Sequence, residues 1–456
     1  MRPYHVAIVG SGPSGFFAAA SLLKAADASQ DIDVAVDMLE MLPTPWGLVR
    51  SGVAPDHPKI KSISKQFEKT AEDHRFRFFG NVVVGEHVES SELAERYDAV
   101  IYAVGAQSDR SLNIPGEHLP GSISAVDFVG WYNAHPNFAH CTPDLSGARA
   151  VVVGNGNVAL DVARILVTDP DVLALTDIAD HALESLRPCG VEEVVIIGRR
   201  GPLQTAFTTL ELRELADLEG VDVIVDPAQL EGITDEDAAA AGKTTKLNLK
   251  VLRDYSQREP RPGHRRIVFR FLTSPIEIKG DGRVESIVLG RNELVTDESG
   301  RVAAKDTGER EELPARLVVR SVGYRGVPTP GLPFDDKSAT IPHADGRVEG
   351  SRNQYVVGWI KRGPTGVIGT NKKDSQDTVD TLLADLAGSK QEDALADFPD
   401  DHADKLAEWL ASRQPKLVTS EHWQAIDRHE RSAGEPHGRP RVKLPSMDEL
   451  LRISHG

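Results

Sequence analysis

Two glycine-rich turns, each placed between an apolar run and a helix pattern, constrain the fold of this chain more than any other feature. The first lies in VAIVGSGPSGFFAAA (residues 6–20) and the second in VVVGNGNVALDVARIL (residues 151–166). A strand, a GxGxxG or GxGxxA turn and a helix together make the phosphate-binding start of a dinucleotide-binding βαβ unit. The sequence therefore predicts two such units, about one small domain apart.

The domain organisation follows from two similar stretches between and after these turns. AVIYAVGAQSDRSLNIPG (99–116) and LVVRSVGYRGVPTPG (317–331) each run from an apolar strand through Val-Gly to Pro-Gly. We interpret them as the outgoing and returning crossovers between two domains. Strand and helix patterns alternate along the 456 residues, which is typical of α/β proteins with open parallel sheets. We expect a discontinuous first domain (1–108 and 324–456) with a second domain (109–323) inserted in it.

The first turn has the glycine spacing that a nucleotide pyrophosphate requires. Gly10 permits the tight turn, Gly12 lets a phosphate approach the backbone, and Gly15 lets the helix pack closely on the strand. The following strand pattern, DVAVDMLE, ends at Glu40, where a carboxylate suits the ribose hydroxyls of an adenosine. A glycine turn without a ligand is the alternative, but spacing, flanks and terminal acid together favour a nucleotide.

The second turn differs at the position that selects the nucleotide. Gly154, Gly156 and Ala159 form the GxGxxA variant, and the next strand pattern, VEEVVIIGRR, ends in Arg199 and Arg200 rather than in an acid. A guanidinium pair suits the 2′-phosphate of NADP, whereas an acid suits the free 2′-hydroxyl of NAD. The alternative is a solvated arginine pair at a strand end, which leaves the missing acid unexplained.

Two different nucleotides in one chain indicate a transient hydride donor and a resident acceptor, which we assign as NADPH and FAD. The FAD-binding domain would then be 1–108 with 324–456, and the NADP-binding domain 109–323, as in glutathione-reductase-like flavoproteins with two Rossmann-like domains. In residues 355–386 a strand pattern meets a turn and then a helix pattern. The amides of Gly366, Val367 and Ile368 would lie at that helix N-terminus and stabilise negative charge on a reduced flavin. A glycine turn before a packing helix is the alternative.

Composition excludes several classes of function. A formal net charge of −17 disfavours nucleic acid and anionic membranes as partners, because the dominant phosphate interaction would be repulsive. No apolar run approaches the roughly 20 residues that span a bilayer. The two cysteines, Cys141 and Cys189, form neither a CxxC pair nor a metal-ligand set, which indicates a reducing cytoplasm and argues against a disulfide reductase.

Four blocks make the chain similar to a known family: TPWGLVRSGVAPDHPKIK (44–61), GNGNVALDVAR (154–164), GRRGPLQTAFTTLELREL (198–215) and WIKRGPTGVIGTNKKD (359–374). They resemble the signature blocks of adrenodoxin-reductase-type NADPH-ferredoxin reductases, with the mycobacterial members most similar. The resemblance runs from the first strand to GRPRVK (438–443). The chain lacks the targeting extension of the mitochondrial members, so we expect a bacterial, cytoplasmic protein.

The resemblance implies a role for particular residues. Around FAD it places Gly10, Gly12, Ser14, Gly15, Glu40, Leu48, Val84, Trp359, Gly366, Val367 and Ile368. Around NADPH it places Arg110, Asn155, Gly156, Asn157, Val158, Arg199, Arg200, Glu211 and Gly366. It also implies that His57 and Glu214 lie near the nicotinamide and flavin. His57 occurs in the proline-flanked stretch APDHPK, which we expect to be a non-helical loop. A structural histidine and an ordinary helix-face carboxylate are the alternatives.

The predicted function is ferredoxin-NADP(+) reductase, in which a monomer passes electrons from NADPH through FAD to a small acidic iron-sulfur ferredoxin. NADPH releases two electrons together, an iron-sulfur cluster accepts one, and a flavin can mediate between them. RPGHRR (261–266), Lys361 with Arg362, and Lys372 with Lys373 are candidate docking cations, unless they are solvated or bind NADPH phosphates. The alternatives are a nucleotide-binding redox sensor without sustained turnover, an NADPH diaphorase, or an electron-input module of another oxidoreductase.

Overall fold

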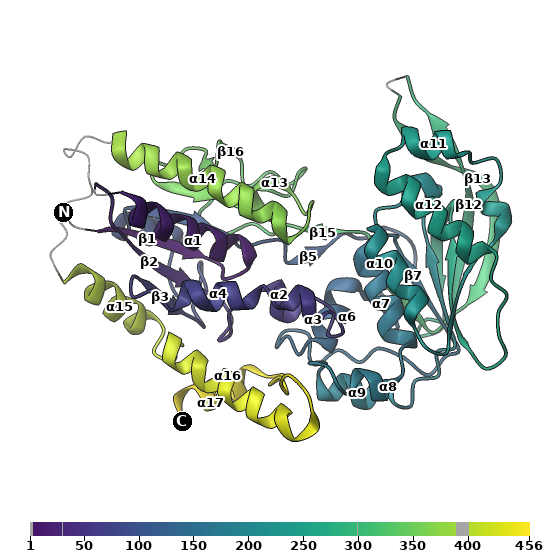
Figure 1. The fold of residues 1–456 in the computed structure, drawn as a ribbon, viewed down its shortest axis with the longest axis horizontal. Coiled ribbons are helices and arrows are strands. Elements are labelled where there is room, and N and C mark those ends of the chain that lie inside the picture. The colour runs from purple at the N-terminus through teal and green to yellow at the C-terminus, as the bar shows by residue number, and fades with distance from the viewer. Residues whose placement is uncertain (1–2, 30, 299, 389–400) are drawn as a thin grey trace. The chain divides into compact units, whose positions relative to one another are not determined.

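The computed structural model describes residues 3–29, 31–298, 300–388 and 401–456 (Figure 1). The chain divides into two compact units. Unit 1 consists of Met1–Ser108 and Tyr324–Gly456, and unit 2 consists of Asp109–Gly323. Where the chain crosses from one unit to the other, β5 (Ser108–Asp109) pairs with β15 (Tyr324–Arg325) as a two-stranded sheet. The two crossovers therefore run side by side, a pairing that the sequence pattern did not predict.

Unit 1 contains a seven-stranded sheet in the order β16-β17-β18-β4-β1-β2-β3. Its strands are β1 (Tyr4–Val9), β2 (Val34–Leu39), β3 (Phe76–Phe79), β4 (Ala99–Tyr102), β16 (His343–Ala344), β17 (Arg347–Val348) and β18 (Gln354–Val356). The five strands from β18 to β3 are parallel, whereas β16, β17 and β18 form an antiparallel meander. Parallel neighbours require crossover connections, which the helices of the unit supply.

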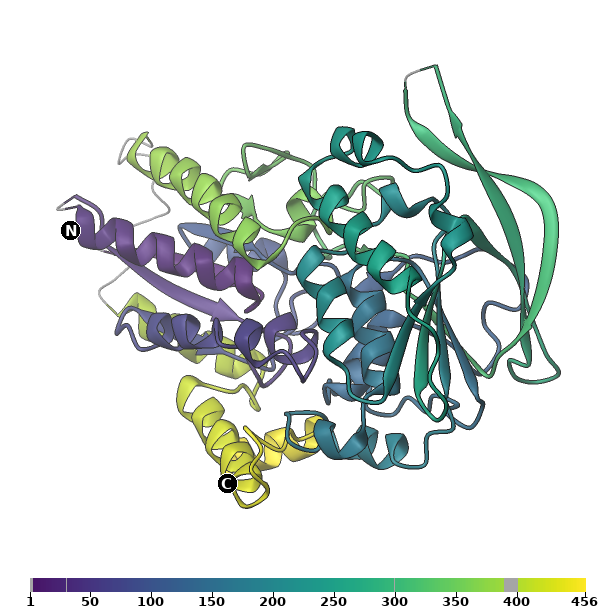
Figure 2. The ribbon, with the colours of Figure 1, turned by 45° about the vertical axis from the view of Figure 1, so that its right-hand side comes forward.

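Helices cover both faces of this sheet. They are α1 (Pro13–Ala28), α2 (Leu48–Ser51), α3 (Pro58–Lys61), α4 (Ser64–Ala71), α5 (Ser90–Arg96), α13 (Trp359–Arg362), α14 (Ile368–Gly388), α15 (His402–Arg413), α16 (Ser420–Gly434), α17 (Met447–His455) and the 3-10 helix Glu435–His437. Alternate residues of β1 face opposite cores: Val6 and Ile8 pack with α1, α14 and α16, and Ala7 and Val9 pack with α5 and α15. Both ribbon views show α14 beside α1 (Figures 1 and 2).

Unit 2 contains a six-stranded parallel sheet and a separate three-stranded antiparallel sheet. The parallel sheet has the order β6-β14-β7-β8-β10-β9. Its strands are β6 (Ser122–Ser124), β7 (Arg149–Val153), β8 (Glu193–Ile197), β9 (Val221–Val225), β10 (Arg265–Arg270) and β14 (Leu317–Arg320). The antiparallel strands are β11 (Thr273–Lys279), β12 (Ser286–Thr296) and β13 (Val302–Pro314).

In unit 2, helices cover one face of the parallel sheet, and the antiparallel sheet covers the other face. Its helices are α6 (Ala125–Tyr132), α7 (Asn157–Val167), α8 (Pro170–Leu173), α9 (Asp180–Leu186), α10 (Thr209–Glu214), α11 (Asp235–Ala240), α12 (Lys243–Ser256) and the 3-10 helices Pro202–Gln204, Leu215–Asp217 and Pro227–Leu230. Val152 of β7 packs into the helical core, whereas Val151 and Val153 pack toward the antiparallel sheet. Figure 2 shows the long β12–β13 hairpin of that sheet. The strand and helix alternation did not predict this second cover.

The architecture is α/β, with two Rossmann-like units of which the first is discontinuous, so the predicted fold class is confirmed. In both units a parallel strand, β1 or β7, runs directly into a glycine turn and a helix. Across the described ranges, no helix is both long and apolar enough to cross a membrane.

Candidate nucleotide-binding sites

The glycine loop of unit 1 contains two glycines required by the backbone and one that faces open space. Gly10 has a φ of +104°, and a methyl group there would lie 2.6 Å from the carbonyl oxygen of Ala103. A methyl group at Gly15 would lie 2.1 Å from the carbonyl oxygen of Gly10. At Gly12 the same methyl group would meet no atom within 4 Å. Gly12 thus keeps space open beside the N-terminus of α1, where a phosphate could approach.

Glu40 follows β2, and its carboxylate is held at this loop by Ser11. Ser11 occupies a position at which the GxGxxG motif allows any residue. Its Oε2 accepts hydrogen bonds from the backbone N–H of Ser11 at 2.9 Å and from the Ser11 hydroxyl at 2.6 Å. Its Oε1 accepts one from the Leu42 N–H at 3.1 Å. Burial raises the pKa of Glu40, and the Ser11 hydrogen bonds partly oppose that rise. The carboxyl group therefore has a defined orientation at the loop where a ribose is predicted.

A strained turn at residues 46–48 lies against the same loop. The N–H of Trp46 donates to the carbonyl oxygen of Ser11 at 3.2 Å, and a methyl group at Gly47 would lie 2.8 Å from Cα of Gly12. Trp46 has a φ of +85°, which is rare for a bulky residue. Leu48, which begins α2, is 37% exposed. The Trp-Gly pair of TPWGLVR is the sequence signal for this turn. The sequence does not indicate that the turn contacts Ser11 and Gly12.

The C-terminal part of the chain reaches the start of α1 through Gly358. Gly358 has a φ of +78°, and a methyl group there would lie 2.2 Å from Oγ of Ser14. The Ser375 hydroxyl donates to the carbonyl oxygen of Ser14 at 2.9 Å, and the Gly358 N–H donates to Oδ2 of Asp374 at 2.6 Å. These contacts bring Ser14 and Trp359, both predicted around FAD, into one region of unit 1.

The N-terminus of α14 offers polar groups that suit an anionic ligand edge. Gly366 has a φ of +81° and Val367 is 61% exposed. Of the three amides predicted to face a flavin, that of Val367 already donates to Oγ1 of Thr370 at 3.2 Å and would have to exchange this bond. The indole N–H of Trp359 is buried and has no hydrogen-bond partner in the part of the chain that the structure describes. A ligand acceptor could satisfy it.

The structure corrects one prediction about the His57 segment. APDHPK is not wholly non-helical, because α3 begins at Pro58 and includes Lys59. Proline suits the first helical position, since the N–H that it lacks would have no partner within the helix. His57 itself precedes the helix, with φ −109° and ψ 62°, and is half-buried.

Val84 and Arg110 lie in connections outside the two glycine loops. Val84 forms an isolated bridge with Val88 and packs against the core that contains Val9. Arg110 follows β5, and its backbone N–H donates to the carbonyl oxygen of Gly323 at 3.2 Å. Its side chain is exposed. The assignment of Val84 to FAD and of Arg110 to NADPH stays a prediction.

The glycine loop of unit 2 repeats the arrangement found in unit 1. Gly154 has a φ of +127°, and a methyl group there would lie 2.0 Å from the carbonyl oxygen of Ser321. A methyl group at Gly156 would meet no atom within 4 Å. Oδ1 of Asn157 accepts the N–H of Thr208 at 2.7 Å, which ties the loop to the segment before α10. Gly156 therefore keeps space open at the start of α7.

The residues flanking Gly156 come from the same turn. Asn155 lies beside the end of β8, since a methyl group at Gly198 would be 2.8 Å from Nδ2 of Asn155. Val158 is half-buried in the first turn of α7. Val158 also packs against the helical core of unit 2, and the assignment of both residues to NADPH stays a prediction.

Arg199 and Arg200 follow β8 with their backbone held and their side chains unpaired. The Arg199 carbonyl oxygen accepts Nδ2 of Asn292 at 2.8 Å, and the Arg200 carbonyl oxygen accepts the N–H of Leu272 at 3.1 Å. Neither guanidinium has a hydrogen bond or ion pair with any residue that the structure describes. Two positive charges on an ordered backbone are thus available to a phosphate.

Helix α10 carries Glu211 and Glu214. Glu211 is buried in the first turn, where its N–H donates to the Thr208 hydroxyl at 3.4 Å. Its Oε2 lies 3.8 Å from Nη1 of Arg164, a buried residue that also pairs with Asp161 at 2.8 Å. Sequence reasoning missed Arg164, whose only signal is a charge on the buried face of an otherwise apolar helix. Glu214 is the last residue of α10, and its pairing with His57 stays a prediction.

Comparisons with known proteins show which family the chain belongs to. The family model described as pyridine nucleotide-disulphide oxidoreductase matches residues 4–253. NADPH-ferredoxin reductase FprA of Mycobacterium leprae is 82% identical over 459 residues, covering 100% of both chains. Mitochondrial NADPH:adrenodoxin oxidoreductase of Salvelinus fontinalis is 42% identical, covering 98% of this chain and 91% of its own length.

A solved structure of a similar protein has the same fold as this chain. Mycobacterium tuberculosis FprA in complex with NADPH is 81% identical and superposes with a TM-score of 0.98 over 100% of both chains. The chain therefore belongs to the pyridine nucleotide-disulphide oxidoreductase family, in the group that contains the NADPH-ferredoxin reductases and NADPH:adrenodoxin oxidoreductase.

Proposed function

We propose that this protein is an NADPH-ferredoxin reductase that holds FAD at the glycine loop of unit 1 and NADPH at that of unit 2. The observation that carries the proposal is the difference between two otherwise similar loops. One is followed by the buried acid Glu40, and the other by the unpaired cations Arg199 and Arg200. Sequence identity of 82% to a protein named NADPH-ferredoxin reductase supports the same assignment.

The residues of each loop have separate tasks in this reaction. FAD, when bound, takes up a hydride from NADPH and releases electrons singly to an iron-sulfur protein. Gly12 and the N-terminus of α1 accommodate one pyrophosphate, and Gly156 and the N-terminus of α7 accommodate the other. The start of α14 would supply a helix N-terminus that stabilises negative charge on the flavin. No protein nucleophile is needed.

The two cysteines support electron transfer to an external acceptor rather than to a disulfide. Cys141 and Cys189 are not joined to each other. Burial raises the pKa of both thiols, which disfavours the reactive thiolate. A monomeric state and a bacterial cytoplasmic location belong to this proposal, and the unpaired thiols support the latter.

The visible spectrum of the purified protein tests the proposal. We expect a yellow protein with one FAD per chain, whose flavin band is bleached by NADPH without oxygen and restored by added ferredoxin. A colourless protein that cannot be reconstituted with FAD contradicts it. A redox sensor, the alternative function, would be bleached by NADPH but would not sustain turnover with a dye acceptor.

The structure changes which cations can receive an acidic acceptor. Arg261 pairs with Asp222 at 2.6 Å and Arg266 with Glu193 at 3.2 Å, so RPGHRR carries less free charge than its sequence suggests. Two further candidates, Lys361 and Arg362, are half-buried: Lys361 pairs with Asp374 at 3.0 Å and Arg362 donates to Asn371 at 2.5 Å.

The candidates that are exposed and have no ion pair with any residue that the structure describes are Lys372 and Lys373, in the first turns of α14. We therefore assign the docking of a small acidic ferredoxin to this end of α14. Its proximity to the proposed flavin segment suits the exit of electrons.

Charge reversal of Lys372 and Lys373 to glutamate is expected to raise the ferredoxin KM about tenfold at low salt. Dye reduction should be spared, because a small dye needs no charged docking surface. The KM of the parent protein should rise with salt, since screening weakens surface attraction. The same reversal at Arg265 and Arg266 is the matched comparison and should have a smaller effect. Salt-independent ferredoxin kinetics would exclude the docking site.

His57 and Glu214 are expected to tune hydride transfer rather than to perform acid-base catalysis, because a hydride moves without a protein-bound proton. Replacement of His57 or Glu214 by glutamine should slow flavin reduction by about tenfold or less, the equivalent of about 1.4 kcal/mol in the barrier. Stopped-flow measurement of flavin bleaching by NADPH checks this. Complete loss of reduction with FAD still bound would show a larger role.

A further inference from the structure

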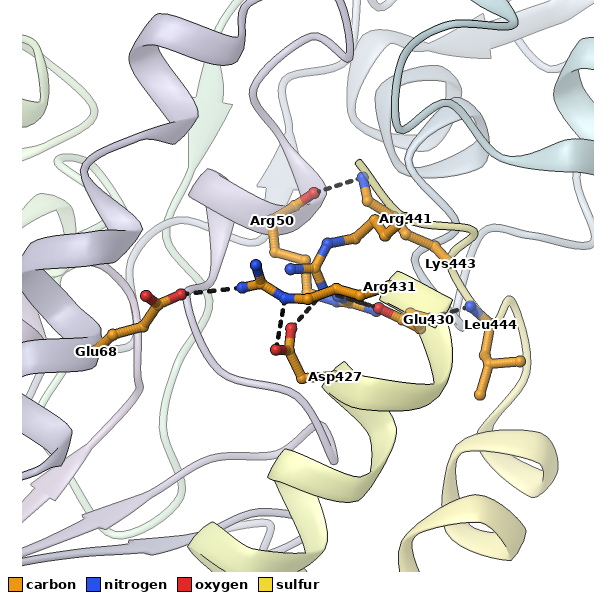
Figure 3. Close-up of polar contacts among 8 residues, drawn as sticks. All are labelled: Arg50, Glu68, Asp427, Glu430, Arg431, Arg441, Lys443 and Leu444. Carbon is orange, nitrogen blue, oxygen red and sulfur yellow. Dashed lines mark hydrogen bonds and ion pairs between the residues drawn. The ribbon is translucent and has the colours of Figure 1, made fainter. Parts of the chain in front are cut away.

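A buried carboxylate near the C-terminus joins two distant parts of unit 1. We call α16 together with residues 435–444 the C-terminal arm. Glu430, on this arm, is 0% exposed. Its carboxylate accepts both Nη atoms of Arg50, at 2.8 and 2.5 Å, and Nη1 of Arg441 at 3.0 Å (Figure 3). The Leu444 N–H adds a bond at 3.0 Å, which gives the carboxylate four donors.

The charge on Glu430 is needed by the groups around it. Burial by itself would raise the pKa of Glu430, but Arg50 and Arg441 outweigh burial and hold the pKa below its ordinary value. The carboxylate is therefore ionised. It is the counter-charge of the buried Arg50, whereas the half-buried Arg441 also pairs with Asp427 at 2.8 Å. Removing one member of such a cluster leaves an uncompensated buried charge.

Three further contacts connect the arm to α2 or to Trp46, which precedes it. Nζ of Lys443 donates to the carbonyl oxygen of Arg50 at 3.0 Å, so it satisfies a carbonyl near the end of that one-turn helix (Figure 3). The ring of Trp423 meets the ring of Trp46 edge-on, with 6.2 Å between centroids, and the Arg50 guanidinium lies 5.5 Å from the Trp423 ring centroid. The arm thus contacts both the side chain and the backbone of Arg50 in α2, and it also contacts Trp46, which precedes α2.

Helix α2 cannot be stable by itself, and the residues before it are strained. A single helical turn in isolation does not persist in water. Trp46 has a φ of +85°, and Gly47 has a φ of +49° with a ψ of −128°. Conformations of this kind persist only where their surroundings enforce them. This strained turn contacts Ser11 and Gly12 of the glycine loop.

We infer that the C-terminal arm, through Glu430, Arg441 and Lys443, holds the turn at residues 46–48 against the glycine loop of unit 1. Glu430 is then a positioning residue for FAD, although it lies outside the loop. The inference rests on the proposed function for the identity of the ligand. It also gives a role to GRPRVK, which contains both Arg441 and Lys443 and which the nucleotide sites leave unexplained.

The variant Glu430→Gln tests this inference in the full-length protein. We expect the FAD dissociation constant of the reconstituted apoprotein to rise about tenfold or more. We also expect faster hydrogen exchange of the backbone amides at residues 46–50 in the apoprotein, because the arm no longer holds α2. Exchange is measured without FAD. If the proposed function is wrong, the parent protein will not bind FAD. If the inference is wrong, hydrogen exchange at residues 46–50 will be the same in Glu430→Gln as in the parent protein.

Two control variants separate positioning from general stability. Asp37→Asn breaks another bidentate pair of unit 1, that of the buried Asp37 with the half-buried Arg77 at 2.7 and 2.6 Å, which does not involve α2. Arg431→Ala removes surface ion pairs of the arm, to Glu68 at 3.2 Å and to Asp427 at 2.7 Å. Both should bind FAD like the parent protein and show parent-like exchange at residues 46–50.

The inference is overturned if Glu430→Gln binds FAD like the parent protein, or if Asp37→Asn weakens FAD binding equally at the same loss of melting temperature. If Glu430→Gln does not fold, Lys443→Met replaces it. That variant keeps an unbranched side chain but removes the donor to Arg50. Faster exchange at residues 46–50 with weaker FAD binding supports the inference, and parent-like values for both overturn it.

Discussion

Replacing Arg199 and Arg200 together by alanine is expected to raise the KM for NADPH about a hundredfold and to leave the KM for NADH nearly unchanged. A hydrogen bond to a charged group contributes about 1.5–3 kcal/mol, and exposure to solvent reduces that figure. Two partly exposed contacts to a 2′-phosphate then total about 2.7 kcal/mol, which is a hundredfold in affinity. Steady-state dye reduction with each nucleotide measures the effect.

Each single variant, Arg199→Ala or Arg200→Ala, should raise the KM for NADPH about tenfold, since each removes one contact to the 2′-phosphate. Arg187→Ala is the matched control. It also removes a surface charge from unit 2, but from an arginine that pairs with Asp171 at 2.9 Å. It should leave both KM values unchanged. Equal losses with NADPH and NADH in the double variant would refute the assignment of these arginines to the 2′-phosphate.

Gly12→Val is expected to weaken FAD binding at least about a hundredfold while the apoprotein keeps its fold. Apart from Gly12 and its two chain neighbours, no atom of the residues that the structure describes lies within 4 Å of the methyl position at Gly12, so the first carbon of the new side chain meets open space when no nucleotide is bound. Gly15→Ala should behave differently. Its methyl group would lie 2.1 Å from a backbone oxygen, so it should lower the free energy of unfolding.

The second loop offers an independent control for the first. Gly156→Val should abolish reduction of the flavin by NADPH but leave FAD bound, because the methyl position at Gly156 is equally open. FAD content from the visible spectrum and melting temperature of the apoprotein distinguish the variants. A Gly12→Val protein that retains FAD with parent affinity would show that the pyrophosphate does not approach this loop.

Local sequence was sufficient for the glycine loops and for the family. Gly10 and Gly154 adopt positive φ angles, and a methyl group at Gly15 would meet the backbone of the same turn, so the local backbone conformation makes the glycine pattern readable. The α/β class followed from the alternation of strand and helix patterns, because the spacing of apolar residues shows which faces of a strand or helix are buried. The resemblance drawn from four sequence blocks is confirmed by relatives at 82% and 42% identity.

Charge patterns were less informative, because their meaning depends on neighbours from elsewhere in the chain. RPGHRR reads as a basic patch, but Arg261 and Arg266 are paired with Asp222 and Glu193 on adjacent strands. Which strands become neighbours is a property of the sheet order and not of the segment. Similarly, the strand pattern alone did not predict that β11, β12 and β13 form a separate antiparallel sheet.

The sequence by itself therefore determined the two nucleotide loops, the α/β class and the family, because each of them is recorded in patterns of residues close together in the chain. Only the tertiary structure decided that Ser11 orients Glu40, that Gly358 contacts Ser14 and that Glu430 holds Arg50. Glu430 and Arg50 are 380 residues apart, and no local periodicity records such a contact. Partners of this kind are selected by packing, in which a buried charge must meet its counter-charge wherever the fold places it.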